Sequence, residues 1–470
     1  MEKPADILDR TDEWTRLADL WGTSEAQLVF AHGRRRVGKS WLLQRFTRQA
    51  NGLYYQAKRG TRREQLGRMT RVVGEYFDDP ALRAATEFPS WENLFEYVTD
   101  RAEGDRLLFV IDEFPYLAQE DPGLTSVLQS LWDHRWKDSA FKLLLCGSHI
   151  TFMQRLEDHD QPLHGRRTAR LQISPFTYRD VAGFVPDYDA RDRLRTYGVF
   201  GGVPGHLDRL DSTRSLGDNV CDLVLDPSGL LHDEATHLLD SFGGQSDVYY
   251  SVLFAIGTGA HTWSEITDRV GRSGGALWPV IEWLQEMELV EREVPVTRDQ
   301  PRKSKVSQYR ITDPYLRFWH TFIQPLYSSG ATGVADPWAL WSERIEPGLD
   351  DYMGQVFEDA CRTFAAEYPG FPVEPLRVGR WWNRTSDEEV DLVVRGVDDR
   401  LLVAECKWGR VTRSDLHTLR ERGRAVADEL GGGTEVLYGL FSGTGQFDEA
   451  IREATEGDDL HRWGPDDLYW

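Results

Sequence analysis

The chain has 470 residues and carries 55 Lys and Arg against 77 Asp and Glu, a net charge of −22. Proteins that coat nucleic acid by bulk charge need a positive surface, so this class is excluded, although a local nucleic-acid site is not. Mean hydropathy is −0.50, no apolar run reaches the roughly 18 residues of a membrane helix, and the charged N-terminus lacks a signal-peptide core, so we expect a cytoplasmic chain without membrane contact.

Short apolar runs alternate with helical stretches in the first 180 residues. Residues 26–32, 106–111 and 141–147 have the length and composition of buried strands, and helix-like segments begin near Ser40, Trp91 and Leu124. This alternation is typical of a parallel α/β sheet that is covered on both faces.

The pattern changes after residue 180. Helices dominate to about residue 240, and from Asp247 three helices are followed by two polar strands around a basic turn at 301–305. Three helices and a hairpin is the order of a winged-helix module. Residues 351–368 predict a further helix, residues 390–394 and 401–408 predict strands, and another helix starts near Ser414.

We therefore predict an α/β fold in four parts. They are a P-loop NTPase core at 1–180, a helical lid at 181–240, a winged helix at 241–325 and a C-terminal α/β domain at 326–470.

A phosphate site is predicted between the first strand and the first helix after it. GRRRVGKS matches the G-x-x-x-x-G-K-[ST] pattern in full. Its backbone N–H groups and the helix N-terminus would surround phosphate oxygens. Lys39 would reach the β- and γ-phosphates of ATP, and Ser40 would ligate Mg²⁺. The residues expected to bind the nucleotide here are Gly33, Arg34, Arg35, Arg36, Val37, Gly38, Lys39 and Ser40.

Two acids and a serine follow the next apolar strands. Asp112 and Glu113 end the strand at 106–111, where Asp112 is expected to be the Mg²⁺ partner and Glu113 the base that activates water. Such acids also often cap a following helix, but the phosphate loop favours the catalytic interpretation. Ser148 ends the third strand, either beside the γ-phosphate or as a helix N-cap.

With these motifs, the chain resembles the archaeal-type ATPases of the STAND/AAA-like branch over nearly its whole length. The matching segments are residues 9–14 (DRTDEW), 33–43 (GRRRVGKSWLL), 111–117 (IDEFPYL), 145–148 (LCGS), 163–181, 200–207 (FGGVPGHL) and 311–325 (ITDPYLRFWHTFIQP). His206 departs from the aromatic residue that this family more often has. The resemblance implies that Arg166 is a phosphate-sensing arginine, acting in cis or across a subunit boundary; the alternative is that it pairs with a surface acid.

The C-terminal domain carries a second constellation. Asp391 lies on one predicted strand, and Glu405 and Lys407, two residues apart, would project from the same face of the next. An acid followed by E-x-K is the arrangement of the restriction-endonuclease-like fold, in which carboxylates hold a divalent metal and the lysine assists the attacking water. Glu358 on the preceding helix could add a third acid. The alternative is a salt-bridged ladder on an exposed sheet face.

Local charge bears on the partner of this domain. Residues 331–470 hold 15 Lys and Arg against 29 Asp and Glu, a net charge of −14 that opposes the approach of DNA. Basic residues gather at 301–305 and at 57–68, where each segment is either a phosphate contact or a solvated surface.

The leading hypothesis is an ATP-hydrolysing switch or motor coupled to a metal-dependent nuclease-like domain that acts on nucleic acid. The alternative is a nucleotide-controlled interaction protein whose C-terminal domain docks or self-associates into a homo-oligomer without cleaving.

Overall fold

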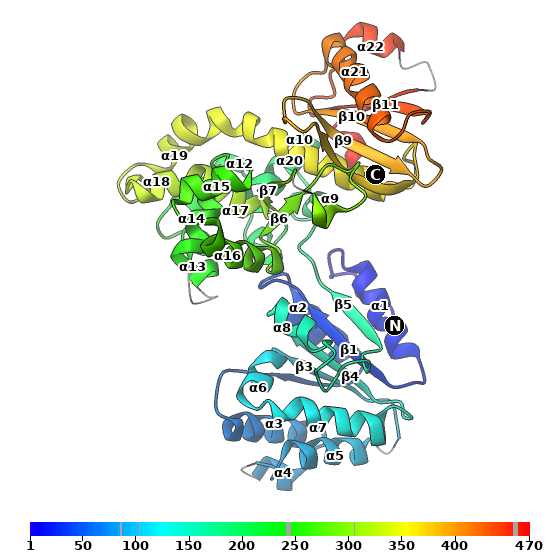
Figure 1. The fold of residues 1–470 in the computed structure, drawn as a ribbon. Coiled ribbons are helices and arrows are strands. Elements are labelled where there is room, and N and C mark those ends of the chain that lie inside the picture. The colour runs from blue at the N-terminus through cyan, green and yellow to red at the C-terminus, as the bar shows by residue number, and fades with distance from the viewer. Residues whose placement is uncertain (85–86, 103, 241–245, 305, 455–458) are drawn as a thin grey trace. The chain divides into compact units, whose positions relative to one another are not determined.

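The computed structural model describes residues 1–470 except 85–86, 103, 241–245, 305 and 455–458 (Figure 1). It divides into two compact units. Unit 1 comprises Met1–Pro175 with Val203–Gly205, and unit 2 comprises Phe176–Gly202 with His206–Trp470. Residue 241, where the predicted winged helix begins, and Lys305 of the basic turn lie outside the described residues. The four predicted domains stay a prediction. No helix in these described ranges is long and apolar enough to cross a membrane.

Unit 1 is built on a five-stranded parallel sheet in the order β2-β3-β4-β1-β5. The strands are β1 (Gln27–His32), β2 (Leu53–Gln56), β3 (Leu108–Asp112), β4 (Lys142–Gly147) and β5 (Ala169–Gln172). The three apolar runs of the sequence are β1, β3 and β4, so the predicted parallel α/β sheet is confirmed. The edge strands β2 and β5 have four residues each, and β2 has no clear apolar signal in the sequence.

Alternate strand residues point to opposite sides of this sheet. Helices cover both sides, so both faces are buried. Phe30 and Ile111 pack into one hydrophobic cluster with α3, α5, α6 and α7. Ala31 and Val110 pack into the other cluster with α1 and α2. The helices of unit 1 are α1 (Thr11–Gly22), α2 (Lys39–Gln49), α3 (Arg62–Tyr76), α4 (Pro80–Ala84), α5 (Trp91–Arg101), α6 (Phe114–Glu120), α7 (Gly123–Leu131) and α8 (Ile150–Arg155).

Helices dominate the chain from residue 178 to residue 367, with one hairpin among them. They are α9 (Tyr178–Val181), α10 (Ala190–Phe200), α11 (Pro204–Leu207), α12 (Leu216–Val220), α13 (Glu234–Asp240), α14 (Ser246–Gly257), α15 (Trp263–Val270), α16 (Gly274–Glu286), α17 (Pro314–Phe318), α18 (Gln324–Ser328), α19 (Pro337–Leu340) and α20 (Glu346–Glu367). The predicted capping box starts α15, with Thr262 as N-cap and Glu265 three residues on. After α16, β6 (Val290–Glu293) pairs antiparallel with β7 (Gln308–Ile311). The predicted order of helices and hairpin is present, whereas its assignment as a winged helix stays a prediction.

A second five-stranded sheet lies near the C-terminus of the chain, in the order β12-β11-β10-β9-β8. Its strands are β8 (Pro375–Trp382), β9 (Glu389–Gly396), β10 (Leu401–Lys407), β11 (Val436–Ser442) and β12 (Leu460–Trp463). β12, β11 and β10 pair in parallel, whereas β9 pairs antiparallel with both β10 and β8. Helix α21 (Arg413–Glu429) connects β10 to β11, and α22 (Glu449–Ala454) follows β11.

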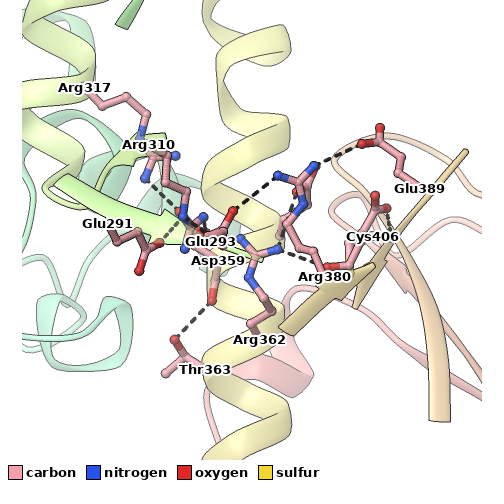
Figure 2. A network of polar contacts seen from close by, with 12 residues as sticks. Glu291, Glu293, Arg310, Arg317, Asp359, Arg362, Thr363, Arg380, Glu389 and Cys406 are labelled. Atoms are coloured by element: carbon pink, nitrogen blue, oxygen red, sulfur yellow. Dashed lines mark hydrogen bonds and ion pairs between the residues drawn. The ribbon is translucent and has the colours of Figure 1, made fainter. Parts of the chain in front are cut away.

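A partly buried ion-pair network connects the hairpin of unit 2 to α20 and the C-terminal sheet (Figure 2). Its centre is Asp359 on α20, which pairs with Arg310 of β7, with Arg317 of α17 at 2.7 Å and with Arg362 of α20. Burial alone would raise the pKa of Asp359, but the three arginines hold that pKa well below its usual range. Asp359 and the three arginines therefore compensate one another's charges, so removing Asp359 would leave the arginine charges without it.

Replacing Asp359 by Asn should destabilise unit 2 by about 3 kcal/mol, because three arginines would then surround an uncharged amide. Urea unfolding followed by tryptophan fluorescence measures the change. Asp398→Asn is the matched control, since Asp398 pairs with Arg400 at a solvent-exposed turn and exposed pairs contribute about 0–1 kcal/mol. Equal losses in the two variants would contradict a special role for the buried network.

Candidate functional site

The phosphate loop joins the C-terminal end of β1 to the first turn of α2. Gly38, the N-cap of α2, has a left-handed backbone with φ 87°, a conformation that favours glycine. The Lys39 ammonium donates hydrogen bonds to the carbonyl oxygens of Gly33 at 2.8 Å and Arg34 at 2.5 Å. Only 4% of Lys39 is exposed, and this burial lowers its pKa. The predicted loop therefore encloses its lysine.

Arg10, in the DRTDEW segment, contacts this loop. Its guanidinium donates to the Val37 carbonyl oxygen at 2.8 Å and pairs with Glu13 at 2.7 Å. Arg10 is buried and precedes α1 with φ 60°. The segment that the sequence marked only by resemblance thus contacts the phosphate loop directly.

Asp112 brings the predicted metal residues together. Its side chain is fully buried at the end of β3. One carboxylate oxygen, Oδ2, accepts hydrogen bonds from the Ser40 hydroxyl at 2.6 Å and from the Tyr54 hydroxyl at 2.6 Å. The oxygens of Ser40 and Asp112 are hard ligands of the kind that Mg²⁺ prefers. These residues therefore suit the Mg²⁺ ion that accompanies a nucleoside triphosphate.

Glu113 and Ser148 also meet in the structure. The Ser148 hydroxyl donates to Glu113 Oε1 at 2.8 Å. Glu113 has φ 53°, a left-handed conformation that is uncommon for a residue with a side chain. Ser148 follows β4, which lies between β3 and β1 in the sheet. The strand order therefore places the serine next to the acid that follows β3.

Arg166 lies elsewhere in unit 1. Its guanidinium forms two hydrogen bonds with the Asp133 carboxylate, at 2.9 and 2.8 Å. It also donates to the carbonyl oxygens of Pro162 at 2.9 Å and His164 at 3.0 Å. None of the hydrogen bonds that the structure describes for Arg166 reaches the phosphate loop, so the predicted phosphate-sensing role would require it to leave Asp133.

Three of the predicted C-terminal residues lie on neighbouring strands of the second sheet, Asp391 on β9 and Glu405 and Lys407 on β10. Ala404 and Cys406 are buried, while Glu405 and Lys407 alternate with them and are partly exposed, as the sequence predicts. Asp391 Oδ2 accepts a hydrogen bond from the Cys406 backbone N–H at 2.9 Å. The Asp391 side chain on β9 therefore contacts the backbone of β10.

The lysine of this constellation pairs with a carboxylate outside the predicted set, although its charge also acts on Glu405. Lys407 Nζ donates to Asp415 Oδ1 at 2.8 Å. Asp415 is the third residue of α21 and also completes the capping box with Thr412. The structure thus gives Lys407 a helix-capping partner that the sequence prediction did not identify.

The three predicted carboxyl groups influence one another. Burial and then the Asp391 charge raise the pKa of Glu358 to about 8. Burial and then the Glu405 charge raise the pKa of Asp391 to about 7. Burial is also the largest cause of the raised pKa of Glu405. Buried acids without full compensation keep their protons to higher pH.

Two arginines, Arg362 and Arg380, lie within 4.0 Å of the Glu358 carboxylate. Glu358 Oε2 is 3.6 Å from Arg362 and 3.8 Å from Arg380. Arg380 also pairs with Glu389 at 3.1 Å and with Glu293 of the hairpin at 3.6 Å. Throughout the ranges that the structure describes, no group of three or more His, Cys, Asp or Glu side chains is arranged to hold a metal ion. The predicted acids are near one another, but they do not form a ready three-ligand site.

The sequence did not identify several of these partners. Tyr54 lies on an edge strand that has little pattern, and Arg380 lies on β8 with no motif around it. A faint signal exists for Tyr54, because Tyr54 and Gln56 are alternate residues and would share one face of a strand.

The raised pKa of Glu358 predicts a pH dependence of stability. The folded chain keeps this proton up to about pH 8, whereas an unfolded glutamate loses it near pH 4. The free energy of unfolding should therefore fall as pH rises between these values, by up to about 1.4 kcal/mol per pH unit for one proton. Glu358→Gln should reduce this slope, which urea unfolding between pH 5 and 8 measures. Glu367→Gln, at the exposed end of the same helix, should leave the slope unchanged; an equal effect would contradict the assignment.

Two parts of the chain match known families. Residues 7–210 match the profile of an ATPase domain predominantly from Archaea. Residues 319–419 match a family described as archaeal and bacterial proteins of unknown function. The second match spans α20, β8, β9 and β10, so it covers the C-terminal acids without giving them a role.

Two relatives and a solved structure are also similar to this chain. An uncharacterized protein of Methanocaldococcus jannaschii is 29% identical over 415 residues, which cover 87% of this chain and 89% of the relative. A second uncharacterized protein of that organism is 36% identical over 56 residues, or 12% of this chain and 54% of the relative. The structure of a Walker-type ATPase from Pyrococcus abyssi aligns with a TM-score of 0.52 and 20% identity, covering 68% of this chain and 97% of that one. At 20% sequence identity, the similarity of the two structures shows a common fold alone. Residues 7–210 thus match an archaeal-type ATPase domain, and the fold is similar to that of a Walker-type ATPase; both findings support binding and hydrolysis of ATP.

Proposed function

We propose that the protein is an ATP-hydrolysing molecular switch whose phosphate loop binds Mg·ATP. The observation that carries the proposal is the contact at 2.6 Å between Ser40 and the buried Asp112, directly after the enclosed Lys39. These are the groups that a P-loop ATPase needs at the β- and γ-phosphates.

Each residue of this site has a defined task in the proposal. The loop N–H groups and the N-terminus of α2 bind phosphate oxygens, and Lys39 supplies a positive charge. Ser40 and Asp112 would hold Mg²⁺, which when bound neutralises phosphate charge. Glu113 accepts a proton from the attacking water, and the Ser148 hydroxyl fixes the direction of its carboxylate.

A short segment supports the switch. Residues Val203–Gly205 pack in unit 1, although the residues on both sides of them belong to unit 2. The Pro204 Cγ lies 3.8 Å from where a Cβ would stand on Gly38 of the phosphate loop. On the unit 2 side, a Cβ on Gly202 would lie 1.8 Å from the Phe176 carbonyl oxygen, so only glycine fits there. A change of the loop on nucleotide binding would therefore act on a segment of unit 1 that continues along the chain directly into Gly202 of unit 2.

Variants of the phosphate-loop site should separate binding from hydrolysis. Lys39→Ala should abolish binding of a fluorescent ATP analogue. Glu113→Gln should keep that binding but slow hydrolysis by about a hundredfold or more, because a positioned general base contributes about 10²–10⁴.

Glu92→Gln is the matched control for Glu113→Gln, since Glu92 is exposed in the first turn of α5 in the same unit. Hydrolysis by Glu113→Gln at the rate of the control would remove Glu113 from the base role.

For the C-terminal domain, the geometry favours the non-cleaving docking role over the nuclease. Lys407 is bonded to Asp415, and Glu358 lies within 4 Å of two arginines. A cleavage site would need the lysine at the acids and the acids free for a metal. The nuclease stays the second candidate, favoured by the raised pKa values of Asp391 and Glu358, because strongly shifted acids often mark functional sites.

A nucleic-acid partner would meet the hairpin turn more easily than the helix before it. Arg302 and Lys303 are exposed in the turn, whereas α16 carries Glu282 and Glu286 and no basic residue. A duplex backbone would therefore contact the turn, where positive charge can neutralise phosphates.

A plasmid-nicking assay with Mg²⁺ or Mn²⁺, with and without ATP, distinguishes the two roles. We expect no nicking, together with nucleotide-dependent self-association seen by light scattering of the Glu113→Gln protein. Nicking that is lost in Asp391→Ala and Lys407→Ala, but kept in the control Asp398→Ala, would overturn the docking role in favour of the nuclease.

A further inference from the structure

The edge strand β2 presents two polar side chains toward the proposed metal residues. Leu53 and Tyr55 point into the hydrophobic cluster on one face of the sheet, so Tyr54 and Gln56 point to the other. β2 pairs with β3 in parallel, with Gln56 opposite Asp112. The strand therefore places these two side chains beside the end of β3 that carries Asp112.

Both side chains donate to the same carboxylate oxygen as Ser40. Asp112 Oδ2 accepts from Tyr54 at 2.6 Å and from Gln56 at 3.4 Å, in addition to Ser40 at 2.6 Å. The other oxygen, Oδ1, accepts the Glu113 backbone N–H at 2.9 Å. Both oxygens are thus held in fixed directions, and Tyr54 supplies the shorter of the two contacts from β2.

Tyr54 can keep its hydrogen bond to Asp112 when the Ser40 hydroxyl turns toward the cation. Tyr54 lies on β2, whereas the phosphate loop leads into α2, so Tyr54 is not part of that loop. The Tyr54 phenol is a neutral donor at pH 7, because a tyrosine hydroxyl ordinarily loses its proton only at pH ~10. A neutral donor orients the carboxylate and leaves its negative charge available to a cation.

We propose that Tyr54 is a positioning residue that orients Asp112 for the divalent cation bound with the nucleotide. The proposal rests on the ATPase function proposed above. Without the Tyr54 hydroxyl, the carboxylate can rotate away from Ser40, and the site must order it each time the cation binds. Cation affinity falls, whereas binding of the nucleotide itself does not depend on this hydroxyl.

The test compares Tyr54→Phe with unchanged protein in binding of a fluorescent ATP analogue, first in EDTA and then with increasing Mg²⁺. Affinity in EDTA should stay within about twofold. The Mg²⁺ concentration that gives half of the affinity gain should rise about tenfold, the factor expected for a lost hydrogen bond to a charged group. Hydrolysis should be slow at low Mg²⁺ and return toward the unchanged rate at high Mg²⁺.

Tyr55→Phe is the matched control, because it removes the neighbouring tyrosine hydroxyl, which contacts Gln65 on the opposite face. It should leave the Mg²⁺ dependence unchanged. Equal Mg²⁺ dependence of Tyr54→Phe and unchanged protein would overturn the positioning role. Loss of analogue binding in EDTA by Tyr54→Phe would also overturn it, since Tyr54 would then be structural. If the unchanged protein itself binds no nucleotide, the ATPase proposal fails, which is a separate result.

Discussion

The burial of the Asp112 charge is the constraint on which the phosphate-loop site depends. A carboxylate without solvent contact is stable only when protein donors replace the water it has lost. The donors come from the phosphate loop, from β2 and from the backbone after β3. The parallel sheet gathers these sources at one edge, because the carboxyl ends of its strands all lie there.

Three buried acidic sites in this chain are compensated in different ways. Asp112 accepts its hydrogen bonds from neutral donors, and the Lys39 charge interacts with it without a direct hydrogen bond among those described. Asp359 is surrounded by arginines, which cancel its charge and make it a structural centre. Glu358 and Asp391 are compensated incompletely, as their raised pKa values show. The kind of partner therefore distinguishes a site suited to a cation from one that holds the fold together.

The sequence predicts local chemistry well and long-range pairing poorly. The phosphate loop and Asp112 could be identified because a complete motif lies between a strand and a helix, and the alternation of Glu405 with Cys406 follows from strand geometry. The partner of Arg166 could not be identified, since 77 acids are available and only the fold selects Asp133. Lys407 was placed near Glu405 by spacing, yet the start of α21 supplies Asp415 as its partner.

The segment Val203–Gly205 has a thermodynamic consequence. These three residues pack in one unit and continue at both ends into the other. If nucleotide at the phosphate loop alters the affinity of unit 2 for any partner, that partner must alter nucleotide affinity by the same factor. A partner of unit 2 would then regulate ATP binding as much as ATP regulates the partner, so the direction of signalling would be set by which of the two is scarce in the cell.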